Sequence, residues 1–138
     1  MMTMKMVLTT VALAGVLAGP IAASAKTPLR EVAVVHDGLL AVGIADEIRK
    51  KCDSISPRMF TAMSFMSSLK RTARGMGYSD DEIEAYVTSK EEKARMRAEG
   101  EKYLKANGVN RANPKTFCDL GRAEIAKGSQ IGKFLKAR

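Results

Sequence analysis

The chain has no tryptophan, one histidine, two cysteines and few aromatic residues, which make up 5% of its 138 residues. Few aromatic side chains argue against nucleic-acid binding, because such surfaces stack bases on aromatic rings. The lone His36 cannot complete a metal site, and no serine or cysteine nucleophile motif accompanies it. The cysteines form no Cys-x-x-Cys pair, which excludes thioredoxin-like motifs and c-type haem attachment. We therefore expect no catalytic residue, no cofactor and no small-molecule substrate.

Long apolar runs are also missing after residue 25, and the run before it has the form of an export signal. Met6 to Gly19 is apolar, Pro20 breaks the run, and Ala23-Ser24-Ala25 offers the small residues that signal peptidase reads. A membrane span needs about 20 apolar residues, so this run is short for one. We expect residues 1–25 to be a signal peptide cleaved after Ala25, leaving residues 26–138 as one exported domain. The alternative is an uncleaved amino-terminal anchor.

Export from the cytoplasm predicts how the two cysteines are used. An exported protein meets an oxidising compartment, so Cys52 and Cys118 predict one intramolecular disulfide. It would close a loop that the chain-entropy model values at about 4 kcal/mol of stability. Buried free thiols and an intermolecular bridge are the alternatives.

The residues that are abundant are Ala, Val, Ile, Leu and Met, at helical spacing. Their pattern predicts an all-α fold, a small orthogonal bundle of four to five helices with one disulfide. Caps, proline and glycine place the helices at Glu31 to Lys51, Pro57 to Arg74, Asp80 to Val87, Ser89 to Asn107, and Asn113 to Ala137. The first helix is apolar nearly all round, which predicts a central position. A strand at Val32 to Val35 is the alternative for its start.

Capping signals mark the helix starts. Ser56 before Pro57 predicts an N-cap followed by proline at the first helical position. Ser79 with Glu82 three residues later is a capping box, and Ser89 begins a similar pattern.

Three stretches of the chain are similar to one known family: GIADEIRKKCDSISPRM from Gly43 to Met59, ARGMGYSDDEIEAYV from Ala73 to Val87, and CDLGRAEIAKGSQIG from Cys118 to Gly132. They resemble a domain-of-unknown-function family of small exported alphaproteobacterial proteins. The resemblance implies a periplasmic location. Relatives are encoded near respiratory NADH dehydrogenase subunits, an association of gene neighbourhood that fixes no role for any residue. It brings no activity, cofactor or catalytic residue.

Three methionines, Met59, Met63 and Met66, fall on one helix face at spacings of four and three. Thioethers are soft ligands that suit Cu(I), so this face is a candidate metal site, to which Met76 and His36 could add ligands. Methionine also fills core gaps. The pattern favours this second interpretation, in which the face packs inward and no metal binds.

Glu124 interrupts the apolar face of the last helix. A buried carboxylate is costly unless it is paired, so we expect either a salt bridge to a nearby basic residue or a polar anchor for a partner. The basic residues form three loose clusters: Arg49, Lys50, Lys51 and Arg58; Lys70, Arg71 and Arg74; and Lys127, Lys133, Lys136 and Arg138.

The formal net charge is +8. A protein surface with this excess of positive charge can dock on anionic lipid or an acidic protein. Solvated basic faces also occur simply to maintain solubility. We expect a non-enzymatic periplasmic interaction or accessory protein, chaperone-like or associated with an envelope or respiratory complex. Its partner would be an unknown protein or an anionic membrane surface, and not nucleic acid. The alternative is a periplasmic Cu(I)-binding protein, and a small enzyme built around His36 and Glu124 is a third hypothesis.

Overall fold

The computed structural model describes residue 15 and residues 26–138. The expected signal peptide, Gly15 apart, lies outside the described residues. The elements are η1 (Leu29–Glu31, a 3-10 turn), α1 (Ala33–Lys51), β1 (Ile55–Pro57), α2 (Met59–Gly75), α3 (Asp80–Thr88), α4 (Lys90–Ala106), α5 (Lys115–Lys127), α6 (Gln130–Lys133) and β2 (Leu135–Ala137). The predicted all-α fold with one disulfide is confirmed, with a small two-stranded ladder added to it.

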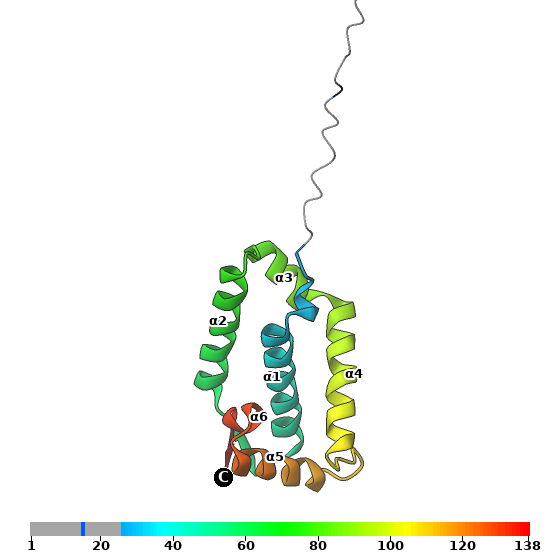
Figure 1. Cartoon of the computed structure of the whole chain (residues 1–138). Helices are drawn as coiled ribbons and strands as arrows, with labels where there is room; N and C mark the ends of the chain where they lie inside the picture. Colours follow the sequence, from blue (N-terminus) through cyan, green and yellow to red (C-terminus); the bar gives the residue numbers. More distant parts are fainter. Residues whose placement is uncertain (1–14, 16–25) are drawn as a thin grey trace, which may run out of the picture.

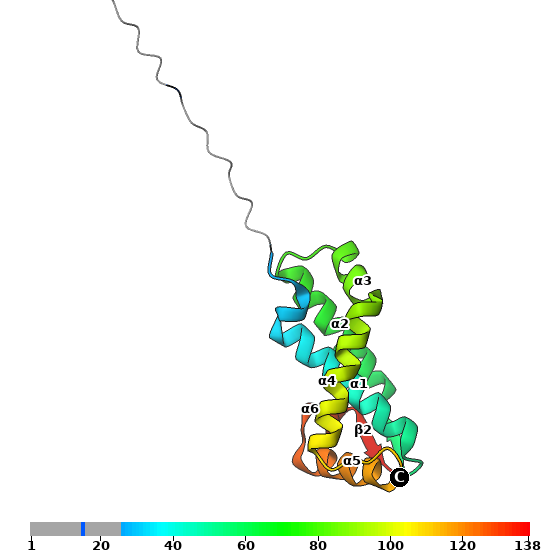
Figure 2. The same ribbon diagram turned by 90° about the vertical axis from the view of Figure 1, so that its right-hand side faces the viewer.

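Helix α1 is the centre of the bundle, as its all-round apolar sequence predicts. Helices α2 and α4 stand on either side of it, α5 crosses one end, and α3 bridges the other end (Figure 1). Residue 26 enters at the α3 end, whereas the carboxyl terminus lies at the α5 end (Figure 2). None of the helices between residues 26 and 138 has both the length and the hydropathy of a membrane span.

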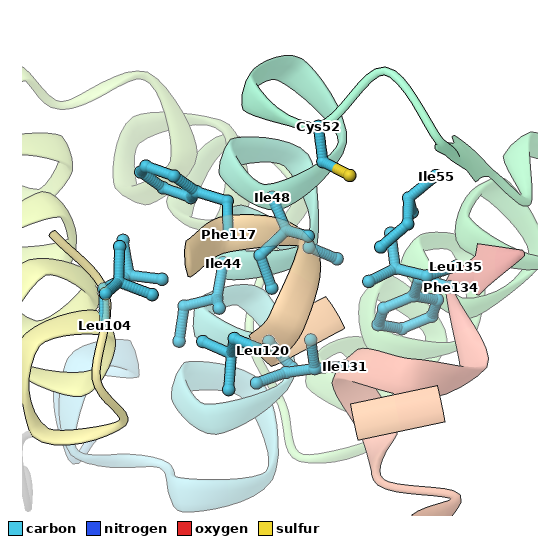
Figure 3. Packing of buried hydrophobic residues seen from close by; sticks show 13 residues of the cluster. Ile44, Ile48, Cys52, Ile55, Leu104, Phe117, Leu120, Ile131, Phe134 and Leu135 are labelled. Carbon is cyan, nitrogen blue, oxygen red and sulfur yellow. The ribbon is translucent and has the colours of Figure 1, made fainter. Parts of the chain in front are cut away.

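Two buried clusters hold the bundle together. The larger one lies at the α5 end, where residues from α1, α4, α5, α6 and both strands converge around Ile48 and Phe117, which are fully buried (Figure 3). Gly121 lets α5 approach α1 closely, because a Cβ there would lie 2.8 Å from Cγ2 of Ile48. The smaller cluster lies at the α3 end and consists of Leu29, Val32, Val35, Ala73 and Tyr78.

The disulfide joins Cys52, directly after α1, to Cys118 in the first turn of α5, with 5.2 Å between the two Cα atoms. This confirms the predicted pairing. The two cysteines are 66 residues apart in the sequence. Because the bridge joins the end of α1 to the start of α5, it fixes the crossing of α5 over the end of α1.

The expected last helix, Asn113 to Ala137, is wrong beyond residue 127. Gly128 adopts a left-handed conformation with φ 63° and ends α5. Ser129 then caps α6 by accepting a hydrogen bond from the Gly132 amide at 3.0 Å. The chain continues as β2, antiparallel to β1. A C-cap glycine followed by an N-cap serine is a stop and restart signal that outweighs apolar periodicity.

The expected helix start at Ser56 and Pro57 is also wrong. Both residues belong to β1, where Ser56 is paired with Lys136. The amide of Arg58 donates to the Phe134 carbonyl at 2.7 Å, so pairing with the carboxyl-terminal segment delays α2 until Met59. By contrast, the capping box of Ser79 is confirmed, and Ser89 caps α4 by accepting from the amide of Glu92.

Candidate functional site

The outward side of α2 carries four exposed apolar side chains. Phe60 is 89% exposed, Met63 61%, Met59 54% and Met66 38%. The interpretation of the methionines as core residues is therefore wrong. Ala62, Phe65, Leu69 and Ala73 take the inward side of the helix instead of the methionines. We call Met59, Phe60, Met63 and Met66 the apolar face of α2.

The start of this face is tied to the carboxyl terminus of the chain. Besides its backbone bond to Phe134, Arg58 donates from Nε to the Leu135 carbonyl at 3.1 Å. The rings of Phe65 and Phe134 pack with their centroids 5.0 Å apart. The first turn of α2 and strand β2 are therefore neighbours, although more than seventy residues separate them in the sequence.

Basic side chains around the strand ladder bind neutral oxygens. The guanidinium of Arg122 donates to Oγ of Ser54 at 2.7 Å, and Nε of Arg138 donates to Oγ of Ser56. Within residues 26–138, Arg58, Arg122 and Arg138 form no salt bridge. Their positive charges are oriented by hydrogen bonds but not neutralised by carboxylates.

The predicted interaction residues of the first basic cluster differ in their surroundings. Arg49 and Lys50 bind the carboxylate of Asp46 at 2.7 and 2.6 Å, so their charge is used within α1. Lys51 is exposed, and Arg58 lies against the ladder. The fold unites Arg58 with Lys136 and Arg138, which the sequence placed in a separate cluster. Sequence reasoning missed Arg122, because only the folded chain brings it beside β1.

The charge of the molecule is concentrated at one end. Residues 49–58 and 115–138 contain ten Lys and Arg but only three Asp and Glu, whereas residues 26–48 and 59–114 contain twelve of each. The first set forms the end of α1, β1, α5, α6 and β2, which lie together (Figure 1). We call residues 49–58 and 115–138 the basic end; it carries the whole net charge of residues 26–138.

Glu124 has no exposed surface, yet it is fully paired. The hydroxyls of Tyr103 and Ser129 donate to its two carboxylate oxygens, and the ammonium of Lys127 lies 3.1 Å from Oε1. Burial raises the pKa of Glu124, but the hydrogen bonds from these donors outweigh burial and lower that pKa below its usual value. Burial and the bond to Glu124 raise the pKa of Tyr103 to about 12. Glu124 therefore forms the predicted salt bridge and ties α4, α5 and α6 together.

His36 lies elsewhere, between α1, α3 and α4. Its Nε2 is 2.7 Å from a carboxylate oxygen of Glu99, and its Nδ1 is 3.4 Å from the Tyr86 hydroxyl. Both ring nitrogens are thus engaged away from α2, so His36 does not complete the methionine face. The hydrogen bonds of His36 and Glu124 share no residue. Among residues 26–138, no group of three or more His, Cys, Asp and Glu side chains is placed to hold a metal ion.

Two grooves flank α1. One of about 450 Å³ lies against α4, where Arg111 binds both Glu47 and Glu101. These two carboxylates raise the pKa of the Arg111 guanidinium. The other groove, of about 250 Å³, is mainly apolar, lies between α1, α2 and α3, and is bordered by Met66. Lys50 is the one residue of the basic end that lines the first groove, and neither groove is lined by Arg58, Arg122, Arg138 or Phe60.

Comparison with known proteins gives a family but no activity. No curated protein and no solved structure matches the chain. Residues 27–136 match the profile of a family described as "Family of unknown function (DUF5333)". Because this match spans most of the chain, the protein belongs to that family.

Proposed function

We propose that the protein is a non-enzymatic accessory protein of the periplasm that docks on a component of the cell envelope. The docking surface would combine the apolar face of α2 with the neighbouring part of the basic end, at Arg58, Arg122, Lys136 and Arg138. The single observation that carries the proposal is this juxtaposition of exposed apolar side chains and unneutralised guanidinium groups. Contiguous exposed apolar residues with a polar rim mark interaction sites.

The arrangement of the other polar groups supports a binding role over catalysis. Both cysteines are consumed by the disulfide. His36 is hydrogen-bonded to two side chains, those of Glu99 and Tyr86. Neither of them is a serine or cysteine nucleophile. Glu124, the one buried charged residue in the described chain, is enclosed by its three donors and presents no free oxygen to a substrate.

Site-specific photo-cross-linking in living cells tests the docking role. A benzophenone amino acid replaces Phe60 in one variant and the exposed Lys93 of α4 in the control. We expect one predominant adduct, of protein or of lipid, from position 60 only, and its loss when Met59 and Met63 are also changed to serine. Identical adducts from both positions, or none from position 60, would exclude docking through α2. Fractionation and an intact mass beginning at Lys26 test the periplasmic address.

The exposure of Met59, Met63 and Met66 favours one alternative function, Cu(I) binding. Residues at i, i+4 and i+7 lie along one side of a helix, and the three thioethers are open to solvent instead of buried. Titration with Cu(I) under reducing conditions should then give one equivalent bound, which is lost in the triple Met→Leu variant and kept in Met76→Leu. Retention of copper by the triple variant would eliminate this alternative.

A further inference from the structure

We propose that the envelope component is the anionic surface of a phospholipid membrane, with Phe60 and its neighbouring methionines inserted among the lipids and the arginines of the basic end bound to headgroup phosphates. This inference rests on the proposed function and names its partner. It assigns a peripheral mode of attachment to a chain whose described helices do not span a membrane.

The charge distribution is the first argument. The basic end carries the entire net charge, while the rest of residues 26–138 is balanced. A protein with this polarity is oriented as it approaches a negative surface, because only one end is attracted within a Debye length of about 8–10 Å. Each Lys or Arg near an anionic leaflet contributes about 1 kcal/mol, or about a five-fold gain in binding.

The bonding of the arginines is the second argument. Arg122 and Arg138 are held by serine hydroxyls, and Arg58 by a backbone carbonyl. Each guanidinium has five N–H donors, so one neutral bond orients it and leaves donors for a ligand. Planar guanidinium groups bind phosphate oxygens in a bidentate manner. Three exposed guanidinium groups that can bind phosphate are thus held against the residues of the ladder.

The apolar face is the third argument. Phe60, at 89% exposure, protrudes from the first turn of α2, and Arg58 directly precedes that turn. An aromatic ring that projects from a convex helix surface fits a fluid acyl layer without a matching groove. Apolar insertion beside cationic residues is the combination that holds interfacial helices on anionic bilayers. Neither term alone gives stable attachment, which explains why both occur together here.

The charge of the basic end disfavours a second copy of the chain as the occupant. Pairing two such surfaces would bring two basic ends together, and like charges in contact oppose association. The segment has few acids to relieve this repulsion, since the basic end holds only Asp53, Asp119 and the fully paired Glu124.

Vesicle binding tests the proposal on the protein purified from cells that express the full chain. The vesicles are either pure phosphatidylcholine or phosphatidylcholine mixed with phosphatidylglycerol, and bound protein is measured by flotation at low salt and at about 0.5 M NaCl. The charge variant is Arg122→Gln, Lys136→Gln and Arg138→Gln. Its matched control removes three charges from α4, with Lys93→Gln, Lys102→Gln and Lys105→Gln. Phe60→Ser is compared with Met76→Ser, another exposed apolar residue.

We expect binding only to the vesicles that contain phosphatidylglycerol, and its weakening by salt. The charge variant should bind about a hundred-fold more weakly, at about five-fold a residue, and Phe60→Ser about ten-fold more weakly. Both controls should bind like the parent protein, with thermal unfolding confirming that all variants are folded. Equal binding to pure phosphatidylcholine, no binding to either vesicle, or an equal loss in the α4 control would overturn the proposal. A protein adduct at position 60 without vesicle binding would refute the membrane and leave the docking function standing.

Discussion

The two ends of the molecule use their charged side chains differently. At the α3 end, basic groups bind carboxylates on other elements, in the pairs Lys26–Glu82, Arg30–Glu92 and Arg74–Asp80. At the basic end, the arginines around the ladder bind hydroxyl and carbonyl oxygens. The α3 end therefore compensates its charges internally. The basic end pairs Arg49 and Lys50 with Asp46 but leaves the arginines around the ladder available to a partner.

The buried clusters explain how the basic end stays folded with few ion pairs around the ladder. The basic end contains the larger core, the disulfide and the Glu124 group, so its fold does not depend on surface ion pairs. The α3 end has a smaller core of five buried residues and adds several ion pairs around it. Stability and interaction thus draw on separate sets of side chains at the basic end.

Removing the disulfide should have the largest effect. Cys52→Ser with Cys118→Ser should lower the free energy of unfolding by about 4 kcal/mol, because the open chain gains the entropy of a long loop. Urea unfolding measures the change, and the parent protein in reductant should match the variant. A loss below about 1 kcal/mol would mean that the core alone holds α5 across α1.

Glu124→Leu should come next, at about 3 kcal/mol, because it leaves the hydroxyls of Tyr103 and Ser129 without their acceptor. Glu124→Gln retains an acceptor and serves as the milder variant, expected at about 1 kcal/mol. Chemical denaturation at pH 7 measures both. Equal losses from Leu and Gln would show that the acceptor oxygen kept by Gln does not stabilise the fold.

The parent protein and the Glu124→Gln variant also differ in how their stability depends on pH. The pKa of Glu124 is lower in the folded protein than in the unfolded chain. The stability that ionised Glu124 contributes is therefore fully present above its pKa in the unfolded chain, about 4.3. It is lost as the pH falls through the lower pKa of Glu124 in the folded protein. Below about pH 4 the parent protein should lose more stability than Glu124→Gln does, as measured by thermal unfolding. Parallel acid curves for the two proteins would contradict the lowered pKa.

Leu29→Ala probes the α3 end and should cost about 2 kcal/mol, at the low end for a buried leucine, since a small cluster at the edge of the fold can relax. Hydrogen exchange should speed up in η1, α3 and the start of α1, and should stay slow in α5. Uniform acceleration through both ends would mean that the two clusters unfold as one unit.

The features that the sequence predicted are local or compositional. The capping box of Ser79 needs only residues three apart, and two cysteines allow only one internal pairing. Glu124 could be identified as paired because burial of a lone carboxylate is so costly. Each of these follows from residues close in sequence or from a count.

The features that the sequence missed depend on distant pairing. Ser56 and Pro57 have the local chemistry of a helix start, but β2 pairs with them and shifts the start of α2. The rotation of α2 depends on how Phe65 and Leu69 fit against Gly38. A Cβ added to Gly38 would lie 2.9 Å from a methyl group of Leu69. That fit turns the methionines outward, and no periodicity within the helix itself could distinguish the two sides.

The smallest effect should come from single arginines, and it decides whether the comparison holds. Arg111→Gln should cost about 0.5–1 kcal/mol, because Arg111 joins Glu47 of α1 to Glu101 of α4 while remaining partly exposed and screened by solvent. Arg122→Gln should change stability by less than about 0.5 kcal/mol, since it loses one neutral surface bond. Unfolding at about 1 M NaCl should shrink the first effect and leave the second unchanged. If Arg122→Gln proves as costly as Arg111→Gln, the charge of the basic end stabilises the fold itself and is not kept for a partner.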